Sequence, residues 1–404
     1  MTTSRRLRLL YLGNAFPPGM AGQLFVNAHM GETRLAQELS RFAEVQTIGL
    51  LPGKLWKTRL EPKDDSPGLE HELVLWDRNP ALWHCWISWR RLRRHYLEKI
   101  RREGMPDILL VRNLQHVFNH FVKWLRKQPM RPTVVLILGD SGSLGENISF
   151  SRRFRYWFKP MQMLETKSVL LYDACIISNI SAKRYFEPRG IPWTWHPSAF
   201  KTDYTPPVPD INLNGPIRFG YFGALSEGYA VTAMVRAFLK ANVPGSLHIC
   251  GFGDMAGELT KLAEEHPNLH FDGFLPKETD CLDWSQKVDV LINTRLPIRG
   301  QDNSFPSKVF EYGLAGKAIL STITGGVNQV IEKECIYFDT NNFEESLCER
   351  IQEMSNMDRA ELQRRATTIR NLVTQNYSYN EQARRMVEFM KGLVNSRNAQ
   401  NTLH

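Results

Sequence analysis

The chain contains, at residues 303–320, the sequence Asn303-Ser-Phe-Pro-Ser-Lys-Val-Phe-Glu-Tyr-Gly-Leu-Ala-Gly-Lys-Ala-Ile-Leu320. Pro306 suits a helix start, where its missing N–H costs nothing and its fixed φ is helical. Ser307 is a good N-cap residue, and Gly316 suits the left-handed position after a helix. The stretch therefore predicts a polar loop, a short helix from about residue 307 to 315, and a buried strand over residues 318–322.

This loop and helix together indicate an anion site. A polar loop that enters a helix N-terminus faces unpaired N–H groups and the positive end of the helix dipole. Lys308 adds a mobile positive charge suited to phosphate. Glu311, one turn after Ser307, is suited to accept two hydrogen bonds from a vicinal diol such as a ribose. The set suggests a sugar nucleotide, although an ordinary capped helix with solvated Glu and Lys side chains would contain the same residues.

The pattern Pro306-Ser-Lys-x-x-Glu-Tyr-x-x-x-Gly-Lys317-x-Ile-Leu320 resembles the nucleotide-sugar motif of GT-B glycosyltransferases. It is most similar to the retaining family 4, especially bacterial enzymes of polysaccharide and lipid-linked glycan assembly. The resemblance implies an α/β chain of two Rossmann-like α/β/α domains that face each other across a cleft. It also implies a C-terminal helix that crosses back to the N-terminal domain.

The same resemblance assigns roles within the motif. It implies that Glu311 binds the donor ribose and that the helix N-terminus, with Ser304, Phe305 and Ser307, faces the diphosphate. The wider family carries a Glu eight positions before the ribose Glu, near the donor sugar. Asn303 occupies that position here, so Asn303 and Lys308 are the candidates for catalytic roles beside the sugar.

Length and composition agree with a globular chain of two domains. At 404 residues the chain is too long for one compact core. No apolar run reaches the 18 or more residues of a membrane span, and no signal-peptide core precedes the first strand. The six cysteines have no Cys-x-x-Cys spacing and are predicted to be reduced, mostly buried thiols in a cytosolic protein. The formal charge of +9 favours anionic partners.

The N-terminal half opens with a strand over residues 6–12, a glycine-rich loop over residues 13–23 and a helix over residues 24–42. A loop at the carboxyl end of such a strand is where α/β folds bind ligands. It resembles the Pro-x-x-Gly-Gly loop of the same glycosyltransferases, which closes over donor phosphate and acceptor, and this implies roles for Gly19 and Gly22. A plain connector is the alternative. A second strand is predicted over residues 45–51.

Residues 83–103 predict an amphipathic helix with a basic face. Its apolar positions recur at three- and four-residue steps, and its basic positions are Arg90, Arg91, Arg93, Arg94, Lys99, Arg101 and Arg102. A basic face bordered by tryptophans suits an anionic membrane surface, and residues 152–159 have the same aromatic and basic composition. A core-packed helix with a solvated basic face is the alternative. No recognition motif supports nucleic-acid binding.

Further buried strands are predicted over residues 107–112, 133–138 and 173–178. Asp140 follows the second of these, at the strand end where catalytic groups collect in open α/β sheets. In the resembling enzymes a polar residue or a His-Asp pair there faces the acceptor hydroxyl. Because Gly139 replaces the His, Asp140 is the candidate general base. The alternative is an Asp that caps its own turn, as Asp-Ser-Gly sequences commonly do.

The C-terminal half repeats the strand, glycine loop and helix, with a strand over residues 217–223 and a helix from about residue 229. The resemblance implies that Gly223 lies at the donor and that the backbone at Phe274 and Leu275 holds the nucleotide base. The loop after Gly223, residues 224–229, contains no Lys, so Lys308, Arg295 or Arg299 would have to hold the diphosphate. Strands are also predicted over residues 246–250 and 288–293.

The tail is predicted to be helical over residues 343–357, 359–376 and 377–394. Ser378 and Glu381 match a capping box, and residues 395–404 look frayed. The predicted domains are an N-terminal acceptor-binding domain over residues 1–200, a linker over 201–215, a nucleotide-sugar-binding domain over 216–376, and a crossing helix and tail over 377–404.

The predicted reaction is transfer of a sugar from a nucleoside diphosphate sugar to a hydroxyl of a glycan or lipid-linked acceptor. No Asp-x-Asp sequence occurs, so no metal is predicted, and no cofactor besides the donor substrate is expected. The predicted location is cytoplasmic, with peripheral attachment at the inner face of the membrane through the helix carrying Arg90 to Arg102. Two alternatives stay open: a sugar-nucleotide epimerase of the same fold, and a binding scaffold without turnover.

Overall fold

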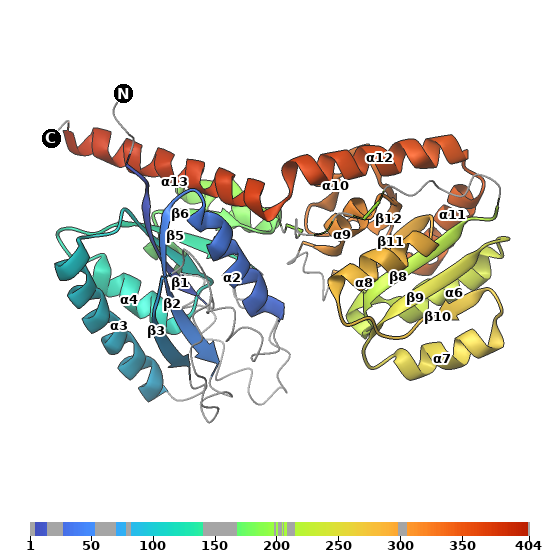
Figure 1. Ribbon diagram of the computed structural model, residues 1–404, viewed down its shortest axis with the longest axis horizontal. Helices are drawn as coiled ribbons and strands as arrows, with labels where there is room; N and C mark the ends of the chain where they lie inside the picture. The colour runs from blue at the N-terminus through green and yellow to red at the C-terminus, as the bar shows by residue number, and fades with distance from the viewer. Residues whose placement is uncertain are drawn as a thin grey trace. The chain divides into compact units, whose positions relative to one another are not determined.

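The computed structural model describes residues 5–13, 27–52, 70–77, 82–139, 168–197, 199–200, 204, 206–207, 215–297 and 305–402. The chain divides into two compact units (Figure 1). Unit 1 comprises Met1–His196 and Tyr379–His404, and unit 2 comprises Pro197–Ser378. Among the described helices, none combines the length and the apolar character that crossing a membrane requires.

Unit 1 is built on a sheet of parallel strands. Its described elements are β1 (Arg8–Gly13), α2 (Asn27–Ser40), β2 (Glu44–Pro52), β3 (Glu70–Asp77), α3 (Leu82–Glu103), β4 (Ile108–Arg112), α4 (His116–Leu125), β5 (Thr133–Leu138), η3 (Val169–Leu171), β6 (Ala174–Ile177), η4 (Ile180–Tyr185), η5 (Glu187–Arg189), β7 (Trp193–Trp195) and α13 (Tyr379–Thr402). The described strands form a 7-stranded sheet in the order β3-β2-β1-β4-β5-β6-β7. The first six follow the order of a doubly wound Rossmann fold.

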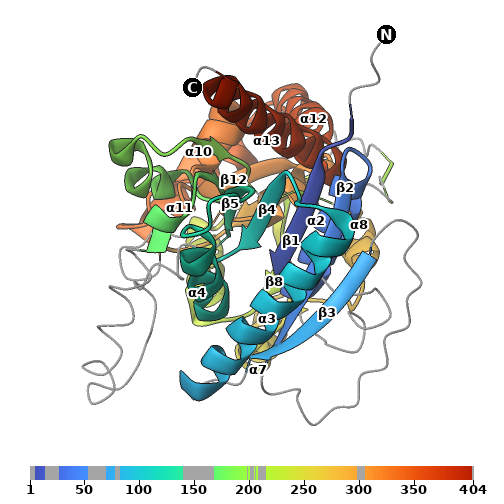
Figure 2. The same ribbon diagram turned by 90° about the vertical axis from the view of Figure 1, so that its left-hand side faces the viewer.

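Helices cover both faces of this sheet because its central strands carry apolar side chains on both faces. Leu10, Leu109 and Leu136 pack into one core with α3 and α4. The neighbouring residues in the strands, such as Leu9 and Leu110, pack into a second core with α2 and α13. Figure 1 shows α2 and α13 on one side of the sheet, and Figure 2 looks onto the side that α3 and α4 cover.

Unit 2 repeats the plan. Its described elements are β8 (Arg218–Ala224), η6 (Glu227–Tyr229), α6 (Val231–Ala241), β9 (Ser246–Phe252), α7 (Ala256–Glu265), β10 (Leu269–Phe271), α8 (Glu278–Trp284), η7 (Ser285–Lys287), β11 (Val290–Asn293), α9 (Lys308–Leu314), β12 (Ala318–Thr322), α10 (Val327–Val330), η8 (Glu332–Glu334), β13 (Ile336–Phe338), α11 (Phe343–Ser355) and α12 (Arg359–Asn376). The described strands form a 6-stranded parallel sheet in the order β10-β9-β8-β11-β12-β13. The prediction of two Rossmann-like α/β units is confirmed.

The short helix α9 is held between the sheet on one side and helix α12 on the other. Tyr312 donates a hydrogen bond of 3.2 Å from its Oη to the carbonyl of Phe222 in β8, and the two rings meet edge to face at 4.8 Å. On its other side α9 packs against α12 at Gly313, where a Cβ atom would lie 2.7 Å from Val373. A seven-residue helix is marginal on its own, so these tertiary contacts hold it in place.

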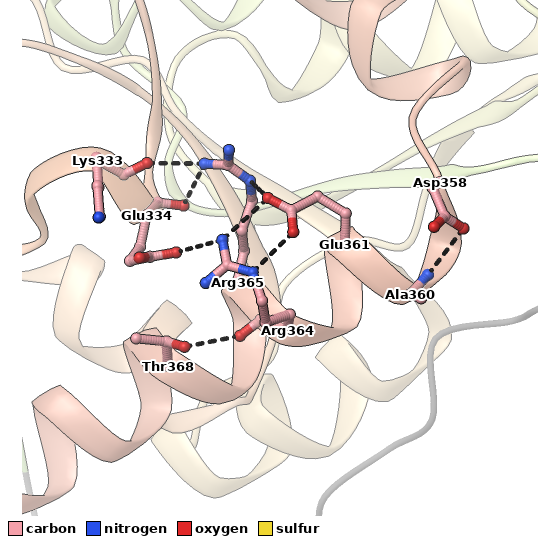
Figure 3. A network of polar contacts seen from close by, with 8 residues as sticks. All are labelled: Lys333, Glu334, Asp358, Ala360, Glu361, Arg364, Arg365 and Thr368. Atoms are coloured by element: carbon pink, nitrogen blue, oxygen red, sulfur yellow. Dashed lines mark hydrogen bonds and ion pairs between the residues drawn. The ribbon is translucent and has the colours of Figure 1, made fainter.

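The first turns of α12 are held by ion pairs (Figure 3). Arg364 and Arg365 both pair with Glu361 one turn earlier, and Arg364 also reaches Glu334 of η8 at 3.0 Å. Hydrogen bonding from Arg364 is the main reason that the pKa of Glu361 falls to about 2. The network fixes the register of the helix against which α9 packs.

Some predicted elements differ from the observed ones. The last helix does not fray after residue 394 but continues to Thr402. Its polar side chains are engaged: Arg397 reaches the Thr133 hydroxyl at 3.3 Å, and Ser396 donates to the Gly392 carbonyl. The helix predicted from Tyr229 begins at Val231, after Ala230 in a left-handed conformation. The structure adds β3, α4, β7, α7, β10 and β13, for which the sequence analysis gives no prediction.

The basic face of α3 is smaller than predicted. Lys99 is buried at 3% exposure and pairs with Glu103 one turn later, with Nζ 2.6 Å from Oε2. This hydrogen bond is the largest of the causes that lower the pKa of Glu103 to about 2. The other predicted basic positions, Arg90, Arg91, Arg93, Arg94, Arg101 and Arg102, are exposed. The second aromatic and basic cluster, residues 152–159, lies outside the described residues.

Candidate functional site

The candidate site of unit 2 lies where its strand order reverses. β9 and β10 are added on one side of β8, and β12 and β13 on the far side of β11. In doubly wound sheets ligands bind beyond the carboxyl ends of the strands at this switch point. β8 ends at Ala224 and β11 at Asn293, so the loops after these two strands and the start of α9 form the place to look for binding groups.

Two of the predicted residues meet at this point. The ammonium group of Lys308 lies directly on the backbone of Gly223, since a Cβ atom at residue 223 would be only 1.2 Å from Nζ. Gly223 also has a φ of +152°, which side chains rarely adopt. The rings of Tyr221 and Tyr229 each have their centroid 5.0 Å from Nζ. Only glycine at residue 223 leaves room for this cation.

The ammonium of Lys308 is buried and makes no hydrogen bond to any atom of the described residues. Burial lowers its pKa from 10.5 to about 8, although the neighbouring Glu311 acts in the opposite direction. Contacts with two aromatic faces recover part of the lost hydration. A buried cation without a hydrogen-bond acceptor is poised for an anion, because pairing offsets the cost of its desolvation.

Arg295 adds a second positive charge beside Lys308. Its guanidinium lies over the Tyr229 ring at 4.8 Å, and Lys308 contacts the same ring. The Thr322 hydroxyl at the end of β12 donates to the Arg295 carbonyl at 2.6 Å. Arg295 further lowers the pKa of Lys308 by charge repulsion, so a bound anion would relieve strain between the two cations.

Glu311 lies one turn after Lys308, on the same side of α9. Its side chain is half-buried, and its charge acts on Lys308 and on the thiol of Cys281. Because Tyr312 anchors the next position of the helix to β8, the direction of Glu311 is set by packing. The carboxylate therefore stands beside the two cations at the edge of the sheet.

The helix start differs from its prediction. Ser307 does occupy the N-cap position of α9, but it has helical dihedral angles and its side chain makes no capping hydrogen bond. The first N–H groups of the turn are used locally, with Val309 donating to Pro306 and Phe310 donating to Ser307. Since α9 has only seven residues, its dipole is small, and the positive charge at the site comes mainly from side chains. The left-handed Gly316 is confirmed, with a φ of +69°.

The ring of Phe305 is engaged by packing within unit 2. It stacks on Phe310 with centroids 5.0 Å apart, and Phe310 stacks in turn on Tyr377 at 4.7 Å. These three rings hold the loop that enters α9 against the end of α12. Phe305 can therefore offer its backbone to a ligand while its ring supports the loop.

Phe274 and Leu275 lie on the segment after β10. Phe274 is 55% exposed and meets Phe252, 57% exposed, edge to face at 5.0 Å. The Leu275 carbonyl accepts a weak hydrogen bond from the Cys281 thiol at 3.9 Å. The pKa of Cys281 is raised chiefly by its hydrogen bond with Cys250, and it responds to Glu311 and Lys308 as well. Cys281 thus links this segment to α9.

One feature of the site was missed by the sequence analysis. Residues 324–326, Thr-Gly-Gly, follow β12, and both glycines are left-handed with φ of +61° and +86°. Thr324 is 2% exposed, and its hydroxyl has no hydrogen-bond partner among the described residues. Buried hydroxyls are normally satisfied, so this one is available to a ligand. The signal in the sequence is the Gly-Gly pair directly after a buried strand.

Several predicted site residues cannot be placed. Gly19, Gly22, Asp140, Asn303 and Ser304 lie outside the described residues. Arg299 does so too. Within the described part of the chain, no group of three or more His, Cys, Asp or Glu side chains is arranged to hold a metal ion. The described site therefore consists of Lys308, Glu311 and Gly223, with Arg295 and the Phe274 segment around them.

Comparison with known families gives one match. Residues 216–356, which lie within unit 2, match the model of the family described as glycosyl transferases group 1. This segment contains β8, α9 and the Thr-Gly-Gly loop. No curated protein matches the chain.

Several solved structures are similar to nearly the whole chain at low sequence identity. HepE from Anabaena in complex with UDP has a TM-score of 0.67 at 15% identity, and the match covers 96% of this chain and 100% of that one. The lipopolysaccharide outer core galactosyltransferase WaaB has a TM-score of 0.69 at 12% identity, covering 96% and 99%. Sucrose-phosphate synthase from Thermosynechococcus elongatus has a TM-score of 0.68 at 12% identity, covering 96% and 100%. The fold is that of the GT-B glycosyltransferases.

The buried ammonium of Lys308 predicts a distinctive pH dependence of stability. Its pKa is about 8 in the folded chain and 10.5 ordinarily, so the unfolded chain binds more protons between these values and the free energy of unfolding rises with pH there. Below pH 8 the charged group costs roughly 3 kcal/mol. Lys308→Met should therefore stabilise the protein most at pH 7, and its advantage should shrink between pH 8 and 10.5, as measured by urea unfolding.

Lys391→Met, at an exposed position of α13, is the control, and its effect should not change over this pH range. An advantage of Lys308→Met that stays constant from pH 7 to 10.5 would mean that the ammonium is solvated in solution and is not held as described.

Proposed function

We propose that the chain is a glycosyltransferase that moves a sugar from a nucleoside diphosphate sugar to an acceptor hydroxyl. The observation that carries this proposal is the buried ammonium of Lys308, which lies on the backbone of Gly223 without a hydrogen bond to any described atom, with Glu311 one turn away. A cation and a carboxylate side by side suit a ligand that has both phosphates and a diol. The match of residues 216–356 to glycosyl transferases group 1 supports this reaction class.

The charges suit departure of a diphosphate. Breaking the bond to the sugar builds negative charge on the leaving oxygen, and preorganised cations in a dry site stabilise that charge far better than water does. Lys308 would meet it directly and Arg295 from the side of Tyr229. Gly223 lets phosphate oxygens approach the backbone because no side chain intervenes. The carboxylate of Glu311 would accept hydrogen bonds from the ribose hydroxyls.

The base of the nucleotide would bind at the tips of β9 and β10. The backbone at Phe274 and Leu275 offers N–H and C=O groups to the edge of a base. The exposed rings of Phe252 and Phe274 offer apolar surface next to it. The complex of HepE with UDP supports a uridine nucleotide as the first donor to try.

The remaining parts of the proposal concern outcome and acceptor. Retention at the anomeric carbon is proposed from the resemblance of the motif to family 4, and the anomeric configuration of the first product, read by NMR, decides between retention and inversion. The proposed acceptor is a glycan or a lipid-linked glycan, and the proposed location is the cytoplasm, at the inner face of the membrane.

A binding experiment on Glu311 tests the donor assignment. A thermal-shift panel of UDP, GDP, ADP and dTDP sugars first selects the nucleotide. Titration calorimetry then compares the ribonucleotide with its 2′-deoxy analogue. Because Glu311 would bind the ribose hydroxyls, Glu311→Gln should weaken the ribonucleotide by about 10–100-fold, as expected for a lost hydrogen bond to a charged group. It should weaken the deoxy analogue much less.

Glu264→Gln, at an exposed position of α7, is the control and should bind both nucleotides like the unmodified protein. Equal losses for the ribonucleotide and the deoxy analogue would remove Glu311 from the ribose, and stabilisation by none of the nucleotide sugars would overturn the proposed function. Isomerised donor, formed without any acceptor, would identify an epimerase instead.

We also propose that the exposed arginines of α3 dock on an anionic membrane. Six of the seven predicted basic positions stay exposed, and Arg93 lies over the Trp124 ring at 4.9 Å. Lys99 does not contribute because it is buried and paired with Glu103, and Arg102, although exposed, bonds to the same carboxylate. Each basic side chain near an anionic surface contributes about 1 kcal/mol, which salt screens.

Flotation with liposomes tests this surface. Vesicles that contain phosphatidylglycerol should carry the protein upward at low salt and release it at high salt, whereas phosphatidylcholine vesicles should not bind it. Replacing Arg90, Arg91 and Arg94 with Gln should abolish flotation, while replacing the exposed Arg384 and Lys391 of α13 should not. Absence of salt-sensitive flotation of the unmodified protein would contradict the proposal.

A further inference from the structure

A second polar cluster lies at the switch point of unit 1. β1 and β4 are the strands at which the order of this sheet reverses, and their carboxyl ends are Gly13 and Arg112. Glu32, on the second turn of α2, reaches this edge and is only 5% exposed. Doubly wound sheets bind ligands at this position. The side chains here differ in type from those of the site in unit 2.

The cluster is a connected set of three side chains. Arg112 Nε lies 3.4 Å from Glu32 Oε1. The Tyr11 hydroxyl donates to the other carboxylate oxygen, Oε2, also at 3.4 Å. Burial, and then the charge of Glu32, raise the pKa of Tyr11 well above its ordinary value, so the phenol keeps its proton and its role as donor. The carboxylate is held from two sides in one orientation.

Two glycines make room for the pair. A Cβ atom at Gly13 would lie 2.9 Å from Glu32 Oε2 and 2.9 Å from Arg112 Cβ. A Cβ atom at Gly139, directly after β5, would lie 2.7 Å from Arg112 Nη2. The guanidinium thus occupies the space that a side chain at residue 139 would need. The Gly139 N–H is in turn fixed by a 3.0 Å hydrogen bond to Asn113 Oδ1.

An ion pair in this position is poorly explained by stability alone. Desolvation of both partners takes back most of the Coulomb energy, and well-packed apolar residues would stabilise a core at least as well. Arg131 and Asp173 form a comparable pair in unit 1, with side chains 18% and 24% exposed, but at the amino ends of β5 and β6. That pair joins the amino ends of two neighbouring strands, whereas Glu32 and Arg112 lie at the carboxyl ends, where a ligand would enter.

We propose that Glu32 and Arg112 form a binding subsite in unit 1 for the hydroxyl groups of an uncharged sugar. The pair presents guanidinium N–H donors next to a carboxylate acceptor, and a sugar carries adjacent hydroxyls that both donate and accept. The pair is neutral overall, so a phosphate would gain from Arg112 and lose to Glu32. Resting on the proposed function, this sugar is the acceptor, or the part of the acceptor that carries the reacting hydroxyl.

The geometry also gives Arg112 a role in shaping this subsite. Because its guanidinium lies on Gly139, the guanidinium covers the backbone at the carboxyl end of β5 and forms part of the surface of the proposed subsite. The ion pair with Glu32 holds it in this position. Arg112 is therefore a binding residue here, and Tyr11 is a positioning residue that acts through Glu32.

The test is binding of sugars to the full chain by saturation-transfer NMR. The probes are the methyl glycosides of glucose, galactose, mannose and rhamnose, with glucose 6-phosphate and inorganic phosphate as anionic probes. At least one methyl glycoside should bind, and more tightly than either anion. The double variant Glu32→Gln/Arg112→Gln, which leaves no unpaired buried charge, should weaken it by about tenfold or more, as expected for lost charge-assisted hydrogen bonds.

Arg131→Gln is the matched control, because it removes an arginine from the comparable ion pair at the other end of the same sheet. It should leave glycoside binding unchanged, and Arg112→Lys, which keeps the charge, should bind more tightly than Arg112→Gln. Each variant is checked for an unchanged affinity for the selected nucleotide, since that site lies in unit 2.

The outcomes separate this inference from the proposed function. No glycoside binding, binding unaffected by the double variant, or tighter binding of the anions overturns the subsite. Nucleotide binding without glycoside binding would leave the donor site standing alone. Glycoside binding that depends on Arg112, with no nucleotide binding, would support the subsite and overturn the glycosyltransferase.

Discussion

The site in unit 2 depends on one costly placement, the burial of the Lys308 ammonium on the backbone of Gly223 between two tyrosine rings. Water no longer solvates this charge, and none of the described atoms accepts a hydrogen bond from it. The same loss of hydration that lowers its pKa makes an anion a far better neighbour here than on the surface, because a charge pair is stronger where water is excluded. Every surrounding element can be understood as what keeps the cation in place: glycine removes the side chain that would displace it, and the rings supply the attraction that water no longer does.

That placement requires a rigid support, which the packing of α9 provides. Tyr312 bonds to β8 and Gly313 admits α12, so the helix that carries Lys308 and Glu311 is clamped between the sheet and a longer helix. The clamp extends through the ion pairs among Glu361, Arg364 and Glu334 (Figure 3). Exposed pairs of this kind add little stability individually, but their geometry fixes the register of α12, and precise placement matters more than energy where a cation must meet a phosphate.

The sequence predicts the fold more fully than the site. Apolar runs such as residues 133–138 coincide with β5 because a strand buried on both faces needs side chains of one kind throughout. β3 was not predicted because its charged and apolar residues do not form a clean pattern. The helical tail was underestimated because the partner of Arg397, Thr133, is set by folding. In the candidate site, local spacing and the resemblance of the motif point to Lys308 and Glu311, and the structure places Lys308 against Gly223. The Ser307 cap fails because the chain entering α9 already has helical angles. Glu32 and Arg112 could not be predicted, since 80 residues separate them and only the sheet brings them together.

The two units use one strand order but place opposite electrostatics at the switch point. In unit 2 two cations crowd around Tyr229 with a single carboxylate one turn away, which leaves a local excess of positive charge. In unit 1, among the described residues at this edge, Arg112 is matched by the carboxylate of Glu32. A sheet edge of this topology collects ligands whatever its charge, so the charge balance decides which ligand each unit accepts. Under the proposed function, the positive edge of unit 2 would attract the anionic donor, and the balanced pair of unit 1 would suit a neutral hydroxyl without competing for the diphosphate.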